Sequence, residues 1–133
     1  MTEAPFETLD FVYWPSRDVA ADLAWFEGVL GARVIFAIQG MGTRVATLQL
    51  SDSPPRILLA GHLDGDVPIL VYRVPRLATA MADLERRGWV RGTTLEIPHG
   101  PVCSFRAPGG QRLAIYELAR PFMDEQFSGR RDI

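Results

Sequence analysis

The sequence has little of several features that mark particular protein classes. Its 133 residues include one cysteine, Cys103, which excludes an internal disulfide and favours a reducing compartment such as the cytoplasm. The net charge is only −2, so no broad cationic surface for nucleic acid is expected. No apolar run reaches the roughly 18 residues of a membrane span, and the acidic start MTEAPFETLD does not resemble a signal peptide. We therefore expect a cytoplasmic protein that binds neither nucleic acid nor membranes.

The composition is that of one globular domain. Of all residues, 47% are hydrophobic and 23% are charged, which suffices for a buried core and a solvated surface. We expect residues 1–120 to form this domain from two modules, at about 8–61 and 68–118. The polar, turn-rich segment 62–67 would link the modules. Residues 121–133 would form a C-terminal tail whose last residues are mobile.

The stretch Leu9–Gly31 predicts a strand followed by an amphipathic helix. Over 9–14, alternate side chains are expected on opposite faces of a strand. Over 19–30, apolar residues recur at helical spacing and therefore share one face. Asp18 precedes this pattern as a candidate N-cap, and Gly31 follows it as a candidate C-terminal cap.

A second stretch, Ile69–Gly88, repeats this order of elements. It predicts a strand at 69–74 and a helix at 77–87. Three strands are expected after each helix, at 33–39, 43–50 and 56–61 in the first half and at 89–95, 102–106 and 112–118 in the second. Each half is a βαβββ module, so the fold class is α+β. Two modules would form a curved eight-stranded mixed sheet around a cleft, with a helix on the outer face of each half.

Three segments resemble the vicinal oxygen chelate (VOC) superfamily, which includes glyoxalase I, bleomycin-resistance proteins and extradiol dioxygenases. They are Leu9–Gly31, the segment 71–88 with the sequence VYRVPRLATAMADLERRG, and the segment 105–118 with the sequence FRAPGGQRLAIYEL. The resemblance implies the two-module fold. It also implies a place for a divalent metal, because the enzymes of this superfamily hold one with His, Glu or Gln side chains from the first and last strands of each module.

The positions that match these metal ligands carry only carbon in this sequence. They are Phe11, Leu58, Ile69 and Ala114. Divalent metals need nitrogen, oxygen or thiolate donors, so we expect neither a metal nor another cofactor in the cleft. The two histidines, His62 and His99, are expected to be partly exposed loop residues without a carboxylate at ligand spacing.

The same strand periodicity, laid on the superfamily fold, gives a candidate lining for the cleft. The candidate ligand-binding residues are Phe11, Tyr13, Thr47, Gln49, Leu58, Ala60, His62, Ile69, Val71, Arg73, Ala114 and Tyr116. Such a surface suits a small aromatic or hydrophobic organic ligand. An inward Arg73 would favour a carboxylate or phosphate on that ligand, whereas the alternative is a solvated arginine. A further alternative is that these side chains fill the cleft as core.

Three functions are compatible with this lining. The leading hypothesis is a metal-independent small-molecule-binding protein of the sequestering, resistance type. The alternative is a VOC-type enzyme (a lyase, isomerase or dioxygenase) with a displaced metal site, or with metal-free acid–base chemistry on Tyr13, Tyr116 or His62. The third is a structural or regulatory dimer with a filled cleft.

A homodimer is expected because relatives commonly form one. Trp14 and Trp89 look exposed, and the tail contains Phe122, Met123 and Phe127, which could pack on the domain or on a second subunit. The sequence leaves open whether the modules pair within one chain or between chains.

Overall fold

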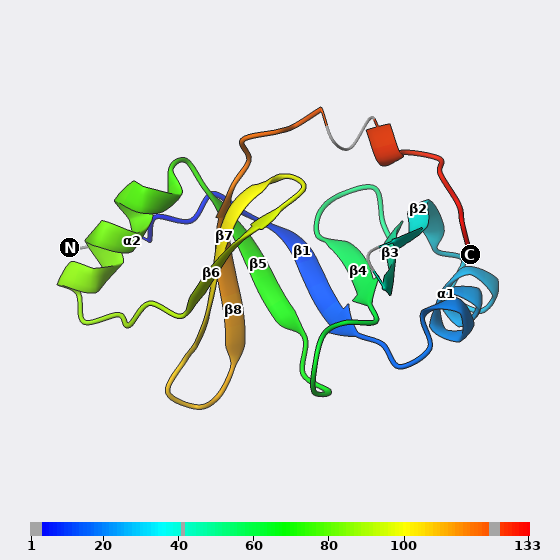
Figure 1. Ribbon diagram of the computed structural model, residues 1–133, viewed down its shortest axis with the longest axis horizontal. Coiled ribbons are helices and arrows are strands. Elements are labelled where there is room, and N and C mark those ends of the chain that lie inside the picture. Colours follow the sequence, from blue (N-terminus) through cyan, green and yellow to red (C-terminus); the bar gives the residue numbers. More distant parts are fainter. Residues whose placement is uncertain (1–3, 41, 123–125) are drawn as a thin grey trace.

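The computed structural model describes residues 4–40, 42–122 and 126–133 and confirms the α+β class (Figure 1). The first half contains strand β1 (Thr8–Pro15), helix α1 (Val19–Gly28) and strands β2 (Arg33–Gly40), β3 (Thr43–Gln49) and β4 (Arg56–Ala60). The second half contains β5 (Ile69–Val74), α2 (Leu77–Arg86), β6 (Thr93–Ile97), β7 (Gly100–Arg106) and β8 (Arg112–Glu117). Each half has the predicted βαβββ order. Neither helix of the described residues is long and apolar enough to cross a membrane.

All eight strands form one sheet, in the order β2-β3-β4-β1-β5-β8-β7-β6. β1 is parallel to β4 and β5 is parallel to β8, while the other neighbours are antiparallel. The two halves meet at the centre of the sheet, where Phe11 of β1 pairs with Val71 of β5 and Tyr13 pairs with Ile69. In this structure the modules therefore pair within one chain.

Helix α1 begins at a side-chain cap and covers one face of β2, β3 and β4. The Asp18 carboxylate accepts a hydrogen bond from the Ala21 backbone N–H at 3.1 Å, which satisfies a free amide of the first turn. Val19 and Leu23 are buried against the sheet. The helix ends two residues before the predicted end, and Gly31, with φ of +71°, then turns the chain into β2.

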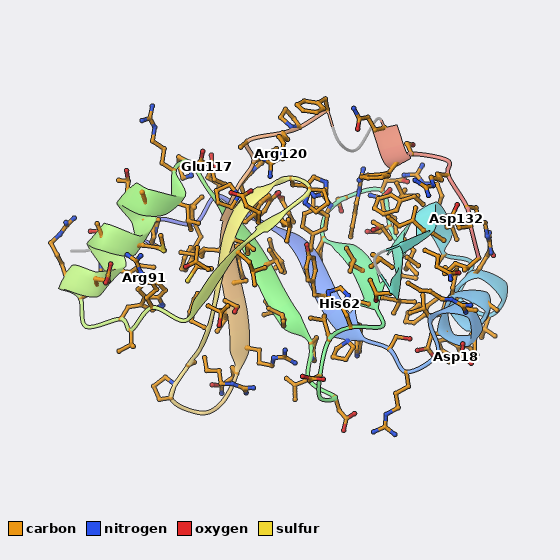
Figure 2. The ribbon with its side chains drawn as sticks, in the orientation of Figure 1. Asp18, His62, Arg91, Glu117, Arg120 and Asp132 are labelled. Carbon is orange, nitrogen blue, oxygen red and sulfur yellow. The ribbon has the colours of Figure 1, made fainter. Side chains whose placement is uncertain are left out.

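Helix α2 covers the same face of the other half of the sheet. Its buried residues recur at the predicted helical spacing and pack on β5, β7 and β8, where Cys103 is also buried: Leu77, Ala80, Met81 and Leu84. The residue before the helix supplies no side-chain cap. Instead, the Leu77 backbone N–H donates to the Glu117 carboxylate at 2.9 Å, and Figure 2 shows Glu117 beside the start of α2.

The predicted strand at 89–95 lies four residues later, at Thr93–Ile97, because α2 ends in a Schellman motif. The Trp89 N–H donates to the Leu84 carbonyl at 3.0 Å, and Gly88, with φ of +94°, donates to the Glu85 carbonyl at 3.1 Å. The prediction that Trp89 is exposed is also wrong. Its indole packs edge-on against Phe105, with 5.3 Å between ring centroids, at the border of the α2 core.

The last residues of the chain, which we expected to be mobile, lie against the free edge of β2 in this structure (Figure 1). The Ala37 N–H donates to the Arg130 carbonyl at 2.9 Å, and the Asp132 N–H donates to the Ala37 carbonyl at 2.6 Å. Phe127 packs on Phe36, with ring centroids 5.5 Å apart, as one of the sequence alternatives proposed. β2 is the edge strand of the sheet, so its outer backbone N–H and C=O groups have no neighbouring strand. The end of the chain forms hydrogen bonds with some of these groups. Met123 lies outside the described residues.

Candidate functional site

The candidate lining residues lie on the face of the sheet opposite the two helices, which we call the concave face. Paired residues of neighbouring strands point to the same face. Tyr13 pairs with Leu58, and Leu58 pairs with Thr47. In the other half, Val71 pairs with Ala114. The repeated register of the two halves therefore puts the residues that match the superfamily's metal ligands on this face.

Side chains fill the middle of the concave face. A third core cluster, separate from those under the helices, consists of Phe11, Ile69, Val71, Val102, Ala114 and Tyr116. Val71 and Tyr116 are each only 1% exposed, and Tyr13, Leu63 and Ile97 pack against the cluster. The structure therefore does not contain one open cleft along the whole sheet. The middle of the concave face is packed as core, which was one of the alternatives from the sequence. Open space remains toward the two ends of this face.

A pocket of about 370 Å³ lies at the end of the concave face where β1 begins, and we call it the Asp10 pocket. Four predicted residues line it: Phe11, Gln49, Arg73 and Tyr116. Six further residues that the sequence did not nominate also line it: Asp10, Asp52, Pro54, Arg56, His99 and Leu118. Seven other predicted residues are buried or half-buried elsewhere on the concave face: Tyr13, Thr47, Leu58, Ala60, Ile69, Val71 and Ala114.

Asp10 reaches this pocket because of an irregularity in β1. Strict alternation places Asp10 on the face opposite Phe11. The pairing of β1 with β5 shifts register between Leu9 and Phe11, as in a β-bulge, and the extra residue between them is Asp10. Its carboxylate consequently meets Tyr116 on the concave face. β1 contains no glycine that would indicate the bulge, and periodicity alone places Asp10 on the other face.

The Asp10 carboxylate is the centre of a compact polar cluster. The Tyr116 hydroxyl donates to one carboxylate oxygen at 2.5 Å, and the Thr8 hydroxyl donates to the other at 2.7 Å. The Arg73 Nε lies 3.6 Å from Asp10 and 3.8 Å from Glu7. A negative charge at Asp10 is thus held by two hydroxyl donors and one guanidinium.

The phenol of Tyr116 stays protonated in this environment. Burial raises its pKa above the usual value, and the hydrogen bond to Asp10 and the charge of that carboxylate raise it further, while Arg73 acts in the opposite direction. Burial likewise raises the pKa of Tyr13. Tyr116 therefore presents a neutral O–H to Asp10 at physiological pH.

His99 is buried, at 5% exposure, which contradicts the expectation of a partly exposed loop histidine. Its ring lies over Phe11 with 5.3 Å between centroids. The cause is a tertiary contact that the sequence does not reveal. The N–H groups of Ala119 and Arg120, which follow β8, both donate to the His99 carbonyl at 2.9 Å and hold this turn against the sheet.

His62 does not belong to the Asp10 pocket. It follows β4, six residues after Arg56, and at about 3.3 Å per residue that places it roughly 20 Å away along the strand direction. There its Nδ1 lies 3.2 Å from the Thr43 hydroxyl (Figure 2 labels His62). The structure therefore does not place His62 with the candidate residues that line the Asp10 pocket.

The donor groups present do not fit the metal site of VOC enzymes. The four matching positions lie on the concave face and carry carbon only, and Phe11 is just 5% exposed. Within the described part of the chain, no three His, Cys, Asp or Glu side chains gather closely enough to hold a metal ion. The chemistry available at the Asp10 pocket is that of two carboxylates, a phenol, an imidazole, a side-chain amide and two guanidinium groups.

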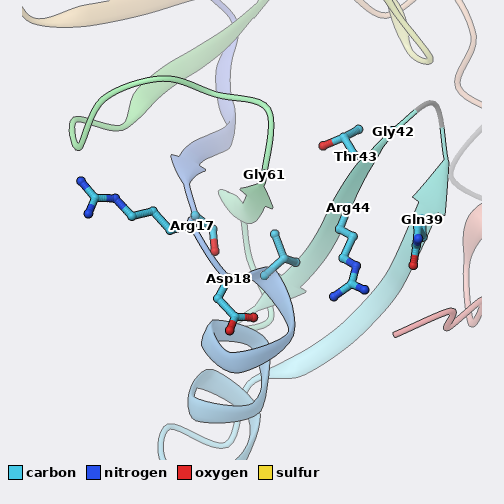
Figure 3. A pocket seen from close by; sticks show the side chains of 9 residues that line it. Arg17, Asp18, Gln39, Gly42, Thr43, Arg44 and Gly61 are labelled. Atoms are coloured by element: carbon cyan, nitrogen blue, oxygen red, sulfur yellow. The ribbon is translucent and has the colours of Figure 1, made fainter.

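A larger hollow of about 490 Å³ lies in the first half of the chain, between the start of α1 and the hairpin of β2 and β3 (Figure 3). Asp18, which lines it, already caps α1. Arg17, also in its lining, has a side chain that is 95% exposed and lies 3.8 Å from Asp66. Asp18 is thus occupied by the helix cap and Arg17 lies in solvent, so the polar cluster of the Asp10 pocket is the stronger candidate site.

Solved structures with the same fold include enzymes. Methylmalonyl-CoA epimerase from Mycobacterium tuberculosis superposes with a TM-score of 0.75 at 20% identity, over 92% of this chain and 95% of that chain. A hypothetical protein from Bacillus halodurans gives 0.72 at 13% identity, over 85% and 95%. Streptomyces coelicolor methylmalonyl-CoA epimerase in complex with 2-nitronate-propionyl-CoA gives 0.70 at 14% identity, over 86% and 96%. No family model and no curated protein matches the sequence. The chain shares the fold of these structures, in agreement with the fold that the resemblance to the VOC superfamily implied.

Proposed function

We propose that this protein is a metal-independent enzyme that moves a proton to or from a small organic molecule held in the Asp10 pocket. The observation that carries the proposal is the 2.5 Å hydrogen bond from Tyr116 to Asp10 at the wall of that pocket. The neighbours with a named activity are epimerases, which favours the enzymatic alternative of the sequence analysis over a sequestering protein. Their low identity leaves the reaction and the substrate as parts of this proposal.

A proton could pass through the hydrogen-bonded pair. The Tyr116 oxygen would take a proton from the substrate while its own proton passes to Asp10, which leaves the substrate anionic and the carboxyl neutral. Arg73, on the same wall, would offset the negative charge that develops on the substrate. Reversal of these steps would return the proton, so the pair would end in its starting state.

The pocket favours a small ligand with an apolar part and a polar part. Its volume lies at the lower end of the range for small-molecule sites. Phe11, Pro54 and Leu118 supply apolar wall, while Arg56 and Arg73 supply positive charge. An aromatic or hydrophobic group against Phe11, with a carbonyl or carboxylate toward the arginines, would satisfy both.

The second candidate function is ligand sequestration without turnover. It is favoured by the partners of Asp10, because this carboxylate already accepts hydrogen bonds from Thr8 and Tyr116 and lies beside Arg73. The pocket would then bind a ligand through the same walls and leave it unchanged.

Solvent-deuterium exchange separates the two candidates. The protein, freed of metal with EDTA, is incubated in D2O with methylmalonyl-CoA and with a panel of 2-substituted carboxylic acids and thioesters, and exchange is followed by NMR. The proposal predicts deuterium at a C–H of at least one probe, with a loss of at least about 100-fold in Asp10→Asn, which keeps the side-chain volume. Binding of a probe without exchange would support sequestration and contradict the enzyme.

The homodimer and the cytoplasmic location stay proposals. Trp14 is 39% exposed and Trp25 on α1 is 52% exposed, and both rings contact Phe26, which supports an apolar contact surface there. Native mass spectrometry would report two chains for the dimer, and a single chain at micromolar concentration would exclude it.

A further inference from the structure

A second pocket lies on the concave face of the second half, at the opposite end of β5 and β8 from the Asp10 pocket. It has a volume of about 300 Å³, and we call it the Arg112 pocket. Arg112 and Ile69 are register partners in it, four residues along their strands from Tyr116 and Arg73. Four residues span about 13 Å, and the buried cluster of the concave face lies between. The Arg112 pocket is therefore separate from the proposed catalytic site.

Two arginines of this pocket sit directly opposite each other on neighbouring strands. Arg106 of β7 is the register partner of Arg112 of β8. Like charges at paired positions repel each other and destabilise a sheet. Both side chains line the pocket, and the described part of its lining contains no carboxylate. The local charge is thus +2, in a chain whose overall charge is −2.

The partners of both guanidinium groups are neutral. Arg112 donates to the carbonyls of Asp64 and Val67 at 2.9 Å each, and Arg106 donates to the Gly110 carbonyl at 3.3 Å. These bonds hold the side chains in place and leave the positive charges uncompensated. Each guanidinium has five N–H donors, so donors remain for a further partner.

Hydroxyl groups complete the polar wall. Ser104 pairs with Thr93 across β7 and β6, and both line the pocket. Ser104 also pairs with Ala114, whose side chain belongs to the core cluster of the concave face, so the hydroxyl shares that face. Two guanidinium forks and two hydroxyls form a set of donors that suits a tetrahedral oxyanion with several acceptor oxygens.

We propose that the Arg112 pocket binds the phosphate group of a phosphate-bearing ligand. The phosphate would compensate the paired charges of Arg106 and Arg112 and would accept hydrogen bonds from the hydroxyls of Ser104 and Thr93. This site does not depend on acid–base chemistry at the Asp10 pocket.

The test is isothermal titration of the full chain with inorganic phosphate and with phenyl phosphate, at an ionic strength held constant with sodium chloride. Constant ionic strength matters because salt screens exposed charges. The variant is Arg106→Gln, which leaves the contacts of Arg112 with the 64–67 segment intact. The matched control is Arg91→Gln, a surface arginine outside the pocket whose guanidinium pairs with Glu85 at 2.8 Å. Ser104→Ala removes one hydroxyl as a second variant.

The proposal predicts that the parent binds at least one of the two probes. Arg106→Gln should weaken that binding about tenfold and Ser104→Ala about fivefold, with Arg91→Gln unchanged. Binding of phenyl phosphate alone would support a phosphate ester as the ligand, and equal binding of both probes would support recognition of the phosphate group itself. No binding of either probe at about 10 mM, or equal losses in Arg106→Gln and Arg91→Gln, would overturn the proposal.

Discussion

Tyr116 shows how one side chain can serve both the core and the site. Its ring belongs to the core cluster of the concave face, and its hydroxyl donates to Asp10 at 2.5 Å. Burial and the carboxylate together keep the phenol protonated. The same contact therefore links the stability of the fold to the chemistry that we propose.

This link predicts a dependence of stability on alkaline pH. The pKa of Tyr116 is raised in the folded state, so above about pH 10 the unfolded chain releases a proton that the folded chain retains. The unfolded state then binds fewer protons, and the free energy of unfolding falls as the pH rises. The Tyr116→Phe substitution should lower the free energy of unfolding by about 1–3 kcal/mol at pH 7, because it removes the hydroxyl that bonds to Asp10. Above about pH 10 the free energy of unfolding of this variant should fall less steeply than that of the parent. Urea unfolding at a series of pH values measures both, and parallel curves for parent and variant would contradict the assignment.

At the scale of elements, the ends of helices depend on single residues. Gly88 has φ of +94° in the motif that ends α2, a conformation that residues with a Cβ adopt at a cost of about 1–2 kcal/mol. Gly28, at the end of α1, is not among the glycines with positive φ, and a Cβ there would meet nothing within 4 Å.

Matched glycine substitutions test this difference. Gly88→Ala should lower the free energy of unfolding by about 1–2 kcal/mol because of its backbone conformation. Gly28→Ala should be neutral or should stabilise by up to about 1 kcal/mol, since alanine restricts the unfolded chain. Thermal and urea unfolding report both changes. Equal effects of the two substitutions would show that the end of α2 is not fixed in this way.

The success of the sequence analysis also differs between elements. Helical spacing located α1 and α2, because one apolar stripe in each helix is buried on the sheet. Strand alternation put Phe11 and Ala114 on the concave face correctly. It failed at Asp10, where a bulge adds a residue. The expectation of an exposed His99, which came from its place in a loop, failed because the burial of His99 depends on hydrogen bonds from Ala119 and Arg120. Alternation and loop position are local properties of the sequence, while both of these features depend on partners distant in the sequence.

At the scale of the whole molecule, the repeat determines the architecture. The two halves share one register pattern and join through β1 and β5, so their concave faces form one surface. The resemblance to the VOC superfamily gave the fold correctly. It could not predict that side chains close the middle of the surface, because that depends on how Tyr13, Leu63 and Ile97 pack over it.

We propose that this chain works without the divalent metal that the resemblance to VOC enzymes implies, because the four matching positions hold Phe11, Leu58, Ile69 and Ala114. Native mass spectrometry of the protein as purified, and again after incubation with Zn²⁺, Co²⁺ or Mg²⁺ and buffer exchange, tests it most directly. We expect the mass of the bare polypeptide in every sample. One tightly held divalent ion per chain, retained through buffer exchange, would contradict it.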